Sequence, residues 1–143
     1  MNTLVVDSSI IVKWINRKDE ENLEEADQII EDMKNGKVDI IAPEIAKYEV
    51  GNVLLKGKQL TPSQASASFV TAYSLPVKFI TESEDLAKET FNMAFDLGIT
   101  YYDASFLSLA KFYDAILVTQ NVKHQGRTKE IKVKHLSEYY LMN

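Results

Sequence analysis

The chain has 143 residues, of which 45% are hydrophobic and 26% charged, so it is long enough for one domain around one core. It contains no cysteine, which excludes a disulfide framework and thiolate metal sites. A net charge of −5 argues against a non-specific binder of the nucleic-acid backbone, and no apolar stretch approaches the roughly 20 residues that span a bilayer. We expect a single soluble, cytoplasmic domain over residues 1–143, without membrane contact or targeting segment.

Short apolar runs alternate with segments of helical period in the first half of the chain. The run LVV at 4–6 predicts a buried strand, and a short helix follows it. An acid-rich helix then starts at Leu23 and ends at Asn35-Gly36, a pair typical of helix C-termini. Residues 38–41 predict a second strand, and Pro43 stands where a helix towards Gly57 can begin.

The same alternation continues in the second half. Thr61 and Pro62 are typical of a helix cap and of the first helical position, and Pro76 ends that helix. Strands are expected at 77–80, 115–119 and 131–133, with helices from Ser83 to near Gly98 and over 101–113. Strands separated by helices imply parallel pairing and a sheet covered on both faces, so the fold class is α/β.

An acid directly follows the first strand. Asp7 and the serines after it are favoured helix caps, and a structural role at the start of a helix is the simplest interpretation. In open α/β sheets, however, ligands bind outside the carboxyl ends of the strands. Asp7 lies at such an end, and so does Asn121, two residues after the strand AILVT.

Two further acids lie on apolar helix stripes. Glu49 shares its stripe with Ala46 and Val53, three to four residues away. An acid in that position has to be paired, protonated or bound to a cation, because an isolated buried carboxylate is very costly. Asp103 is aligned with Phe106, although an aspartate in the first turn of a helix is also favoured as a cap or by the helix dipole.

Three inward-facing acids on separate elements, Asp7, Glu49 and Asp103, predict a site for a hard metal ion. Like charges that converge raise each other's pKa values, and a divalent cation such as Mg²⁺ relieves the repulsion through oxygen ligands. Such a cation polarises a phosphate oxygen and lowers the pKa of bound water. The sequence has no Gly-rich phosphate loop, no nucleophile elbow and no histidine pair at zinc spacing that would support another chemistry.

Three segments, LVVDSSIIVKW, APEIAKYEVGNVL and TYYDASFLSLAKFYDAILVTQN, resemble in order and spacing the sequence blocks of the PIN-domain family, and most closely its VapC-type toxin ribonucleases. The resemblance covers nearly the whole chain, and YYDASFLSLA followed by ILVT is its most specific part. It implies a three-layer α/β/α sandwich with a central, mostly parallel sheet. It also implies an endoribonuclease that hydrolyses RNA phosphodiester bonds with Mg²⁺ or Mn²⁺, as the toxin of a type II toxin–antitoxin pair.

The resemblance assigns roles to individual residues. Asp7, Glu49 and Asp103 match the family's metal-binding acids, and Asn121 stands where a fourth acid is expected, positioned to orient the attacking water. An amide offers a carbonyl oxygen but no charge, so a second metal ion should bind more weakly than the first. The small hydroxyl residues found beside such a cluster are matched by Ser8, Ser9 and Thr119.

Partners also follow from the resemblance, which implies a homodimer and an antitoxin whose peptide occupies a groove near the site. Lys123, Arg127 and Lys129 are candidates for contacts with the RNA backbone. Interface candidates are Ile10, Ile11, Trp14, Phe69, Val70 and Tyr73, although apolar residues at helical spacing usually fill the interior. Two alternatives stay open: a catalytically weak or inactive module that binds RNA or a partner, and an RNA-processing nuclease outside a toxin–antitoxin pair.

Overall fold

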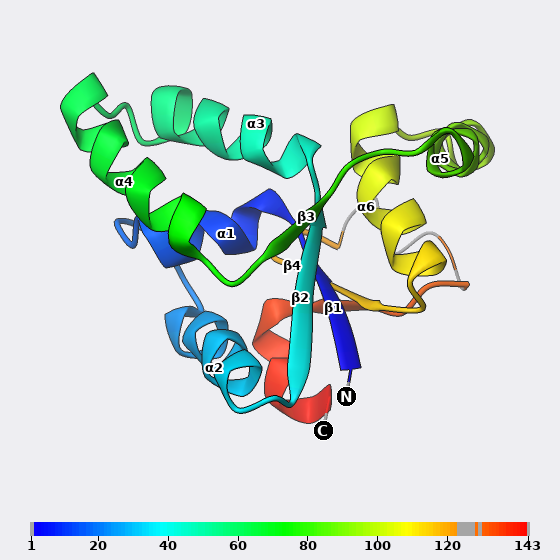
Figure 1. The fold of residues 1–143 in the computed structure, drawn as a ribbon, viewed down its shortest axis with the longest axis horizontal. Coiled ribbons are helices and arrows are strands. Elements are labelled where there is room, and N and C mark those ends of the chain that lie inside the picture. Colours follow the sequence, from blue (N-terminus) through cyan, green and yellow to red (C-terminus); the bar gives the residue numbers. More distant parts are fainter. Residues whose placement is uncertain (1, 123–127, 129, 143) are drawn as a thin grey trace.

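A five-stranded parallel sheet forms the centre of the computed structural model, which describes residues 2–122, 128 and 130–142 (Figure 1). The strand order is β3-β2-β1-β4-β5, and every neighbouring pair is parallel, as predicted. β1 is the middle strand, where Val5 is in register with Ile41 of β2 and Leu117 of β4. The strands are β1 (Asn2–Val6), β2 (Val38–Pro43), β3 (Lys78–Ile80), β4 (Ile116–Thr119) and β5 (Val133–His135).

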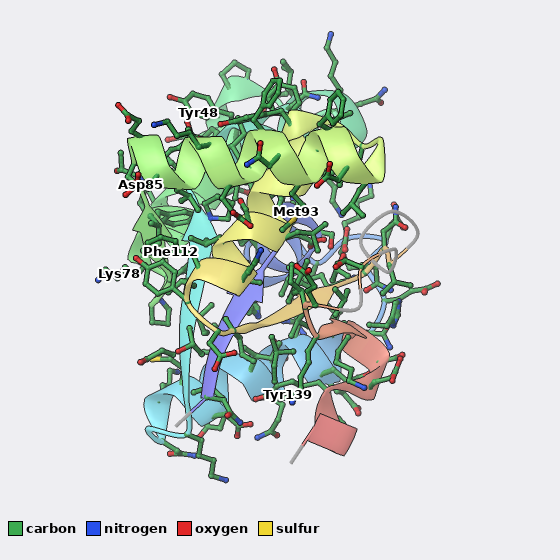
Figure 2. The ribbon with its side chains drawn as sticks, turned by 90° about the vertical axis from the view of Figure 1, so that its right-hand side faces the viewer. Tyr48, Lys78, Asp85, Met93, Phe112 and Tyr139 are labelled. Carbon is green, nitrogen blue, oxygen red and sulfur yellow. The ribbon has the colours of Figure 1, made fainter. Side chains whose placement is uncertain are left out.

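Helices cover both faces of this sheet, which confirms the three-layer α/β/α sandwich (Figure 1). One face carries α1 (Ser8–Ile15), α2 (Leu23–Lys34) and the C-terminal 3-10 helix η3 (Leu136–Met142). The other carries α6 (Tyr101–Phe112), and α5 (Glu84–Leu97) packs on the outside of α6 (Figure 2). A helical hairpin packs on α1 and consists of α3 (Ile45–Asn52), the π-helical turn η1 (Val53–Gly57) and α4 (Pro62–Ser74). None of the described helices combines the length and the apolar character needed to cross a bilayer.

The predicted cap at Thr61 is confirmed, and the helix expected from Ser83 to near Gly98 is present. Thr61 and Gln64 form a reciprocal capping box, with hydrogen bonds of 3.3 and 2.9 Å, and Pro62 occupies the first helical position. The Ser83 side chain caps α5 at its start, and Gly98 ends that helix with a φ of 65°. A positive φ is accessible to glycine without a steric penalty, which explains this residue at the C-terminus of α5.

Two predicted boundaries are wrong. Pro43 is the last residue of β2, in register with Ile80 of β3, and the helix starts only at Ile45. The last strand is Val133–His135 and not 131–133, although Ile131 is buried. In both places the apolar pattern predicted correctly which residues are buried. Where a strand ends depends instead on which of its backbone groups form hydrogen bonds with the neighbouring strand.

The residues after the first strand divide between core and surface. Ile10 and Ile11 are buried, which favours the alternative that they fill the core, although Ile11 also lines a pocket between α1, α3 and α4. Trp14 is half-buried and its indole N–H donates a hydrogen bond of 2.8 Å to the Ala26 carbonyl oxygen, which joins α1 to α2. Phe69, Val70 and Tyr73 on α4 are exposed to solvent.

A buried cluster of ion pairs ties α1 to the helical hairpin. Lys13 is only 2% exposed, and its Nζ lies 3.0 Å from Glu20 Oε1 and donates to the Glu21 carbonyl oxygen at 2.7 Å. The second carboxylate oxygen of Glu20 lies 2.7 Å from Nζ of Lys58, the residue that follows η1. Since a buried charge without its partner is strongly destabilising, this cluster fixes how the hairpin that carries Glu49 sits against α1.

A buried hydrogen bond from Tyr139 joins the C-terminal helix η3 to α2. Tyr139 is labelled in Figure 2. The Tyr139 hydroxyl donates to Asp32 Oδ2 at 2.6 Å, and the Gln28 side-chain amide donates to Asp32 Oδ1 at 2.8 Å. Burial raises the pKa of the Asp32 carboxyl, but these two hydrogen bonds and the nearby charge of Lys37 outweigh it, so the pKa lies below its ordinary value. The charged form of Asp32 therefore stabilises the fold.

Tyr139→Phe should lower the free energy of unfolding by about 1–3 kcal/mol at neutral pH, because it removes the donor from a buried carboxylate oxygen. Tyr140→Phe is the matched control, since Tyr140 is exposed and its hydroxyl lies 3.4 Å from the Glu24 carbonyl oxygen. It should change the free energy by less than about 0.5 kcal/mol. Urea unfolding of both variants measures the difference.

The pH dependence of this effect follows from the lowered pKa of Asp32. Its stabilising contribution is fully present above the ordinary carboxyl pKa and is lost as the pH falls through the lower folded value. The difference in the free energy of unfolding between Tyr139→Phe and Tyr140→Phe should therefore become smaller as the pH falls towards about 3. Equal stability of the two variants at neutral pH would contradict the role given to this hydrogen bond.

Candidate functional site

The predicted site residues from the two central strands meet at the carboxyl edge of the sheet. Asp7 directly follows β1, Thr119 is the last residue of β4, and Asn121 lies two residues further on. β1 and β4 are hydrogen-bonded neighbours, with Val6 in register with Val118. Parallel pairing thus brings together side chains that are 112 residues apart in the sequence.

Asp7 is at once the cap of α1 and a buried acid at this edge. Its Oδ1 accepts the Ser9 backbone N–H at 3.1 Å and the Ser9 hydroxyl, and its Oδ2 accepts the Thr119 hydroxyl. Asp7 is 8% exposed, and this burial raises the pKa of its carboxyl despite the hydrogen bonds that act to lower it. Asp7 therefore caps α1, as the simplest interpretation of the sequence held, and the same side chain is available to the candidate site.

The turn after β4 is fastened to the start of α1 through hydroxyl groups. Thr119 Oγ1 accepts the Asn121 backbone N–H at 2.9 Å, and the Gln120 backbone N–H donates to Ser9 Oγ at 3.3 Å. A threonine hydroxyl has one proton, so while Thr119 donates it to Asp7 its oxygen serves as the acceptor for Asn121. Sequence reasoning missed Gln120, and the available signal was its position directly after a central strand, at the edge where ligands bind.

Glu49 lies on α3, half-buried, and a hydrogen bond joins its side chain to that of Ser8. Burial raises the pKa of its carboxyl most, and the negative charges of Asp7 and Asp103 raise it further, while the Ser8 hydrogen bond acts in the opposite direction. Glu49 is therefore close enough to both other acids for their charges to interact. This relation joins three elements, namely the end of β1, α3 and α6.

Asp103 occupies the first turn of α6, half-buried. The cap of this helix is Thr100, whose hydroxyl accepts the Asp103 backbone N–H at 3.0 Å. The alternative that Asp103 serves as the cap is therefore wrong. Its carboxylate instead contributes to the field that acts on Glu49.

The charges of these acids are not neutralised by a described basic side chain. Among the residues that the structure describes, no lysine, arginine or histidine forms an ion pair with Asp7, Glu49 or Asp103. Within the same residues, no three His, Cys, Asp or Glu side chains are grouped closely enough to hold a metal ion directly. The predicted RNA contacts Lys123, Arg127 and Lys129 lie outside the described residues.

The chemistry of the donor set fits a hard cation. Carboxylate, hydroxyl and amide oxygens are the ligands that Mg²⁺ accepts, and this ion keeps several waters while binding to one or two carboxylates. It therefore does not require direct contact with all three acids. The residues present are compatible with Mg²⁺ or Mn²⁺, and a soft metal is not suited to oxygen donors alone.

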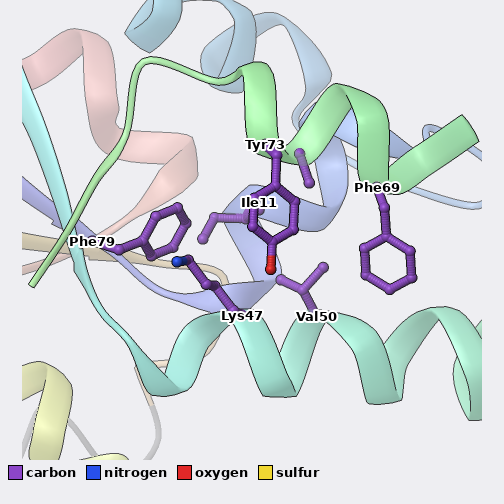
Figure 3. Close-up of a pocket in the computed structure, with 7 residues that line it drawn as sticks. Ile11, Lys47, Val50, Phe69, Tyr73 and Phe79 are labelled. Atoms are coloured by element: carbon purple, nitrogen blue, oxygen red, sulfur yellow. The ribbon is translucent and has the colours of Figure 1, made fainter. Parts of the chain in front are cut away.

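An apolar groove lies between α1, α3 and α4, and Val50, the neighbour of Glu49 in the chain, is part of its wall (Figure 3). Lys47 reaches between two aromatic rings there, with Nζ 4.8 Å from the ring centre of Phe79 and 5.4 Å from that of Tyr73. The same Nζ lies 3.0 Å from Glu44 Oε1. The groove thus combines aromatic surface with a lysine that is paired to an acid.

The sequence matches the family model described as the PIN domain over residues 4–130. A comparison with curated proteins finds no match.

Solved structures share the fold. PAE2754 from Pyrobaculum aerophilum is 21% identical, with a TM-score of 0.69 over 98% of this chain and 88% of that one. VapBC2 from Rickettsia felis, bound to a DNA fragment from its promoter, is 19% identical, with a TM-score of 0.68 over 93% and 98%. VapC20 from Mycobacterium tuberculosis, a sarcin–ricin loop cleaving toxin, is 12% identical, with a TM-score of 0.63 over 90% and 98%. At these identities the likeness establishes the fold.

Glu49→Gln should raise the free energy of unfolding by about 0.5–2 kcal/mol at neutral pH, in the presence of a chelator. A carboxyl with a raised pKa holds its proton more tightly in the folded state, so its ionisation at neutral pH disfavours the fold. The extra stability of Glu49→Gln should decrease as the pH falls through the raised folded pKa of Glu49 towards the ordinary carboxyl value.

Urea unfolding at neutral pH and at about pH 4 tests this prediction. Glu31→Gln, which removes the same charge from an exposed position on α2, is the control and should change stability little. A Glu49→Gln protein no more stable than the control at neutral pH would show that the three acids do not repel one another in solution.

Proposed function

Because the chain belongs to the PIN-domain family, we propose that it is a metal-dependent endoribonuclease that hydrolyses RNA phosphodiester bonds, and the toxin of a type II toxin–antitoxin pair. The observation that carries this proposal is that three acids from separate elements lie together at the carboxyl edge of the sheet, where the charges of Asp7 and Asp103 raise the pKa of Glu49. Two fold neighbours support it: VapC20 is described as a sarcin–ricin loop cleaving toxin, and VapBC2 was solved bound to promoter DNA.

One or two of the three acids would bind Mg²⁺ or Mn²⁺ directly and the rest would contact its waters. The bound cation would supply the positive charge that polarises the scissile phosphate and acidifies water. The other residues position these acids. Ser9 and Thr119 keep both Asp7 oxygens hydrogen-bonded, and Ser8 forms a hydrogen bond with the Glu49 side chain. The Asn121 side chain, exposed at the end of the β4 turn, offers a carbonyl oxygen to orient the attacking water.

The proposal extends to two protein partners. The groove between α1, α3 and α4 is the candidate site for an antitoxin peptide, because its aromatic walls and Lys47 suit a segment with apolar and acidic side chains. For the homodimer the candidate surface is α5, where Phe91 and Phe95 lie one turn apart and are 63% and 79% exposed. Large exposed aromatic side chains that share one helix face are typical of an interface.

Asp7→Asn should reduce Mn²⁺-dependent cleavage of RNA by more than about 100-fold. Mutating a residue that only supports a metal ligand typically costs about 10–100-fold, and the loss of a ligand should cost more. The protein should keep its fold, because asparagine still accepts the Ser9 N–H as a helix cap. Initial rates on total RNA with and without Mn²⁺ measure activity, and circular dichroism checks the fold.

Asp39→Asn, an exposed position on β2, is the charge-matched control and should cut RNA like the parent. Undiminished cleavage by Asp7→Asn would refute the proposed site. An inactive parent whose melting temperature does not respond to Mn²⁺ would instead favour the alternative of a binding module without catalysis.

Asn121→Asp should tighten Mn²⁺ binding about tenfold, or 1.4 kcal/mol, because it adds a charged oxygen ligand where the chain has a neutral one. Titration calorimetry of both proteins measures the change. Asn92→Asp on the exposed side of α5 adds the same charge away from the acids and should leave the affinity unchanged. Equal affinities of Asn121→Asp and the parent would place position 121 outside the metal site.

A further inference from the structure

A hollow opens at the carboxyl ends of β2 and β3, on the same edge of the sheet as the three acids. Its apolar walls are formed by Pro43, Ile45, Ile80 and Leu86. It has about 180 Å³ of space that a water-sized molecule can enter, which is less than the roughly 300–1,000 Å³ typical of sites for drug-sized ligands, so it can take only a smaller group. A hollow of this size with apolar walls accommodates a planar aromatic ring.

Two hydroxyl groups around this hollow donate their protons within the protein. The Tyr101 hydroxyl donates its proton to Glu82 Oε1, and the Ser105 hydroxyl donates to the Tyr102 carbonyl oxygen at 2.6 Å. Burial and the neighbouring Glu82 charge raise the pKa of Tyr101 to about 12, so this phenol stays protonated at neutral pH. Both hydroxyl protons are thus committed within the protein, and the oxygen lone pairs remain for a ligand.

Of the two carboxylates at the hollow, Glu82 is the better acceptor. Glu44 is engaged by Lys47, whereas the partner of Glu82 in the described structure is the neutral Tyr101 hydroxyl. A carboxylate has about four lone-pair sites, so Glu82 can still accept two further donors side by side.

The hollow is adjacent to the acids along two elements. Tyr102, 59% exposed, directly precedes Asp103 on α6. On the other side, Glu44 precedes Glu49 by five residues, which corresponds to about 7.5 Å along a helix axis. A ring held in the hollow would therefore belong to a nucleotide at or next to the phosphate that the acids act on.

We propose that this hollow binds one base of single-stranded RNA beside the cleaved bond and selects guanine. The inference rests on the proposed function, because that function is what brings an RNA chain to this edge. Guanine presents its ring N–H and its amino group as adjacent donors, which one carboxylate accepts together. Uracil presents a single N–H between two carbonyl oxygens, so it can engage only one oxygen of the Glu82 carboxylate and places a carbonyl oxygen next to the other. Tyr102 supplies an exposed ring for stacking, a common way in which proteins hold unpaired RNA bases.

Binding is measured in the Asp7→Asn background, which holds RNA without cutting it. The probes are fluorescein-labelled oligouridylates that carry one central guanosine, adenosine or cytidine, or none, and the readout is fluorescence anisotropy. The guanosine probe should bind about tenfold tighter than the all-uridine probe, as expected for one bidentate base contact. Adding Glu82→Gln should abolish this preference, whereas the control Glu84→Gln, an exposed glutamate two residues away, should keep it.

Cleavage of the same probes by the parent protein with Mn²⁺ separates the two proposals. A guanosine preference in binding that depends on Glu82, without any cleavage, would support the hollow and reject the nuclease. Cleavage without a base preference, a preference for another base, or a preference that survives Glu82→Gln would overturn the assignment of the hollow and leave the nuclease standing.

Discussion

The carboxylate of Asp7 is the point at which β1, α1 and β4 meet, and its burial governs how these elements pack. An isolated buried carboxylate is very costly, so its two oxygens need the donors that Ser9 and Thr119 supply. These donors do not cancel the cost of burial, because the pKa of Asp7 is still raised. The fold therefore retains an unfavourable electrostatic energy at this edge, and a hard cation is the kind of ligand that relieves it.

The ends of helices that have a capping residue could be predicted accurately from the sequence. The caps at Thr61 and Ser83 satisfy backbone donors within three residues, so the local sequence contains the whole interaction. The extent of a strand is a different problem. β2 continues to Pro43 because Ile80 of β3 lies beside it, and a partner 37 residues away leaves no trace in the local pattern.

The residues of the candidate site also differ in whether the local sequence alone could suggest them. Glu49 and Asp103 could be nominated because an acid on an apolar stripe is anomalous, and the anomaly is visible without knowing the partner. Gln120 had only its position after a central strand as a signal and Glu82 had none, since polar residues beside loops and helix starts have many ordinary roles. Their contacts with Ser9 and Tyr101 arise only from tertiary packing.

The distribution of charge at this edge connects metal binding with substrate binding. The Glu82 carboxylate lies at the same edge as the three acids and contacts a neutral hydroxyl, and the chain as a whole has a charge of −5. An RNA phosphate would therefore be repelled from this edge by the described residues. A base with amino and ring N–H donors is attracted by the same acceptors that repel its phosphate. Under the proposed function, a divalent cation held by the acids would make the field positive at the phosphate on which they act. Cation and RNA should therefore each strengthen the binding of the other, because a coupling between two ligands acts equally in both directions.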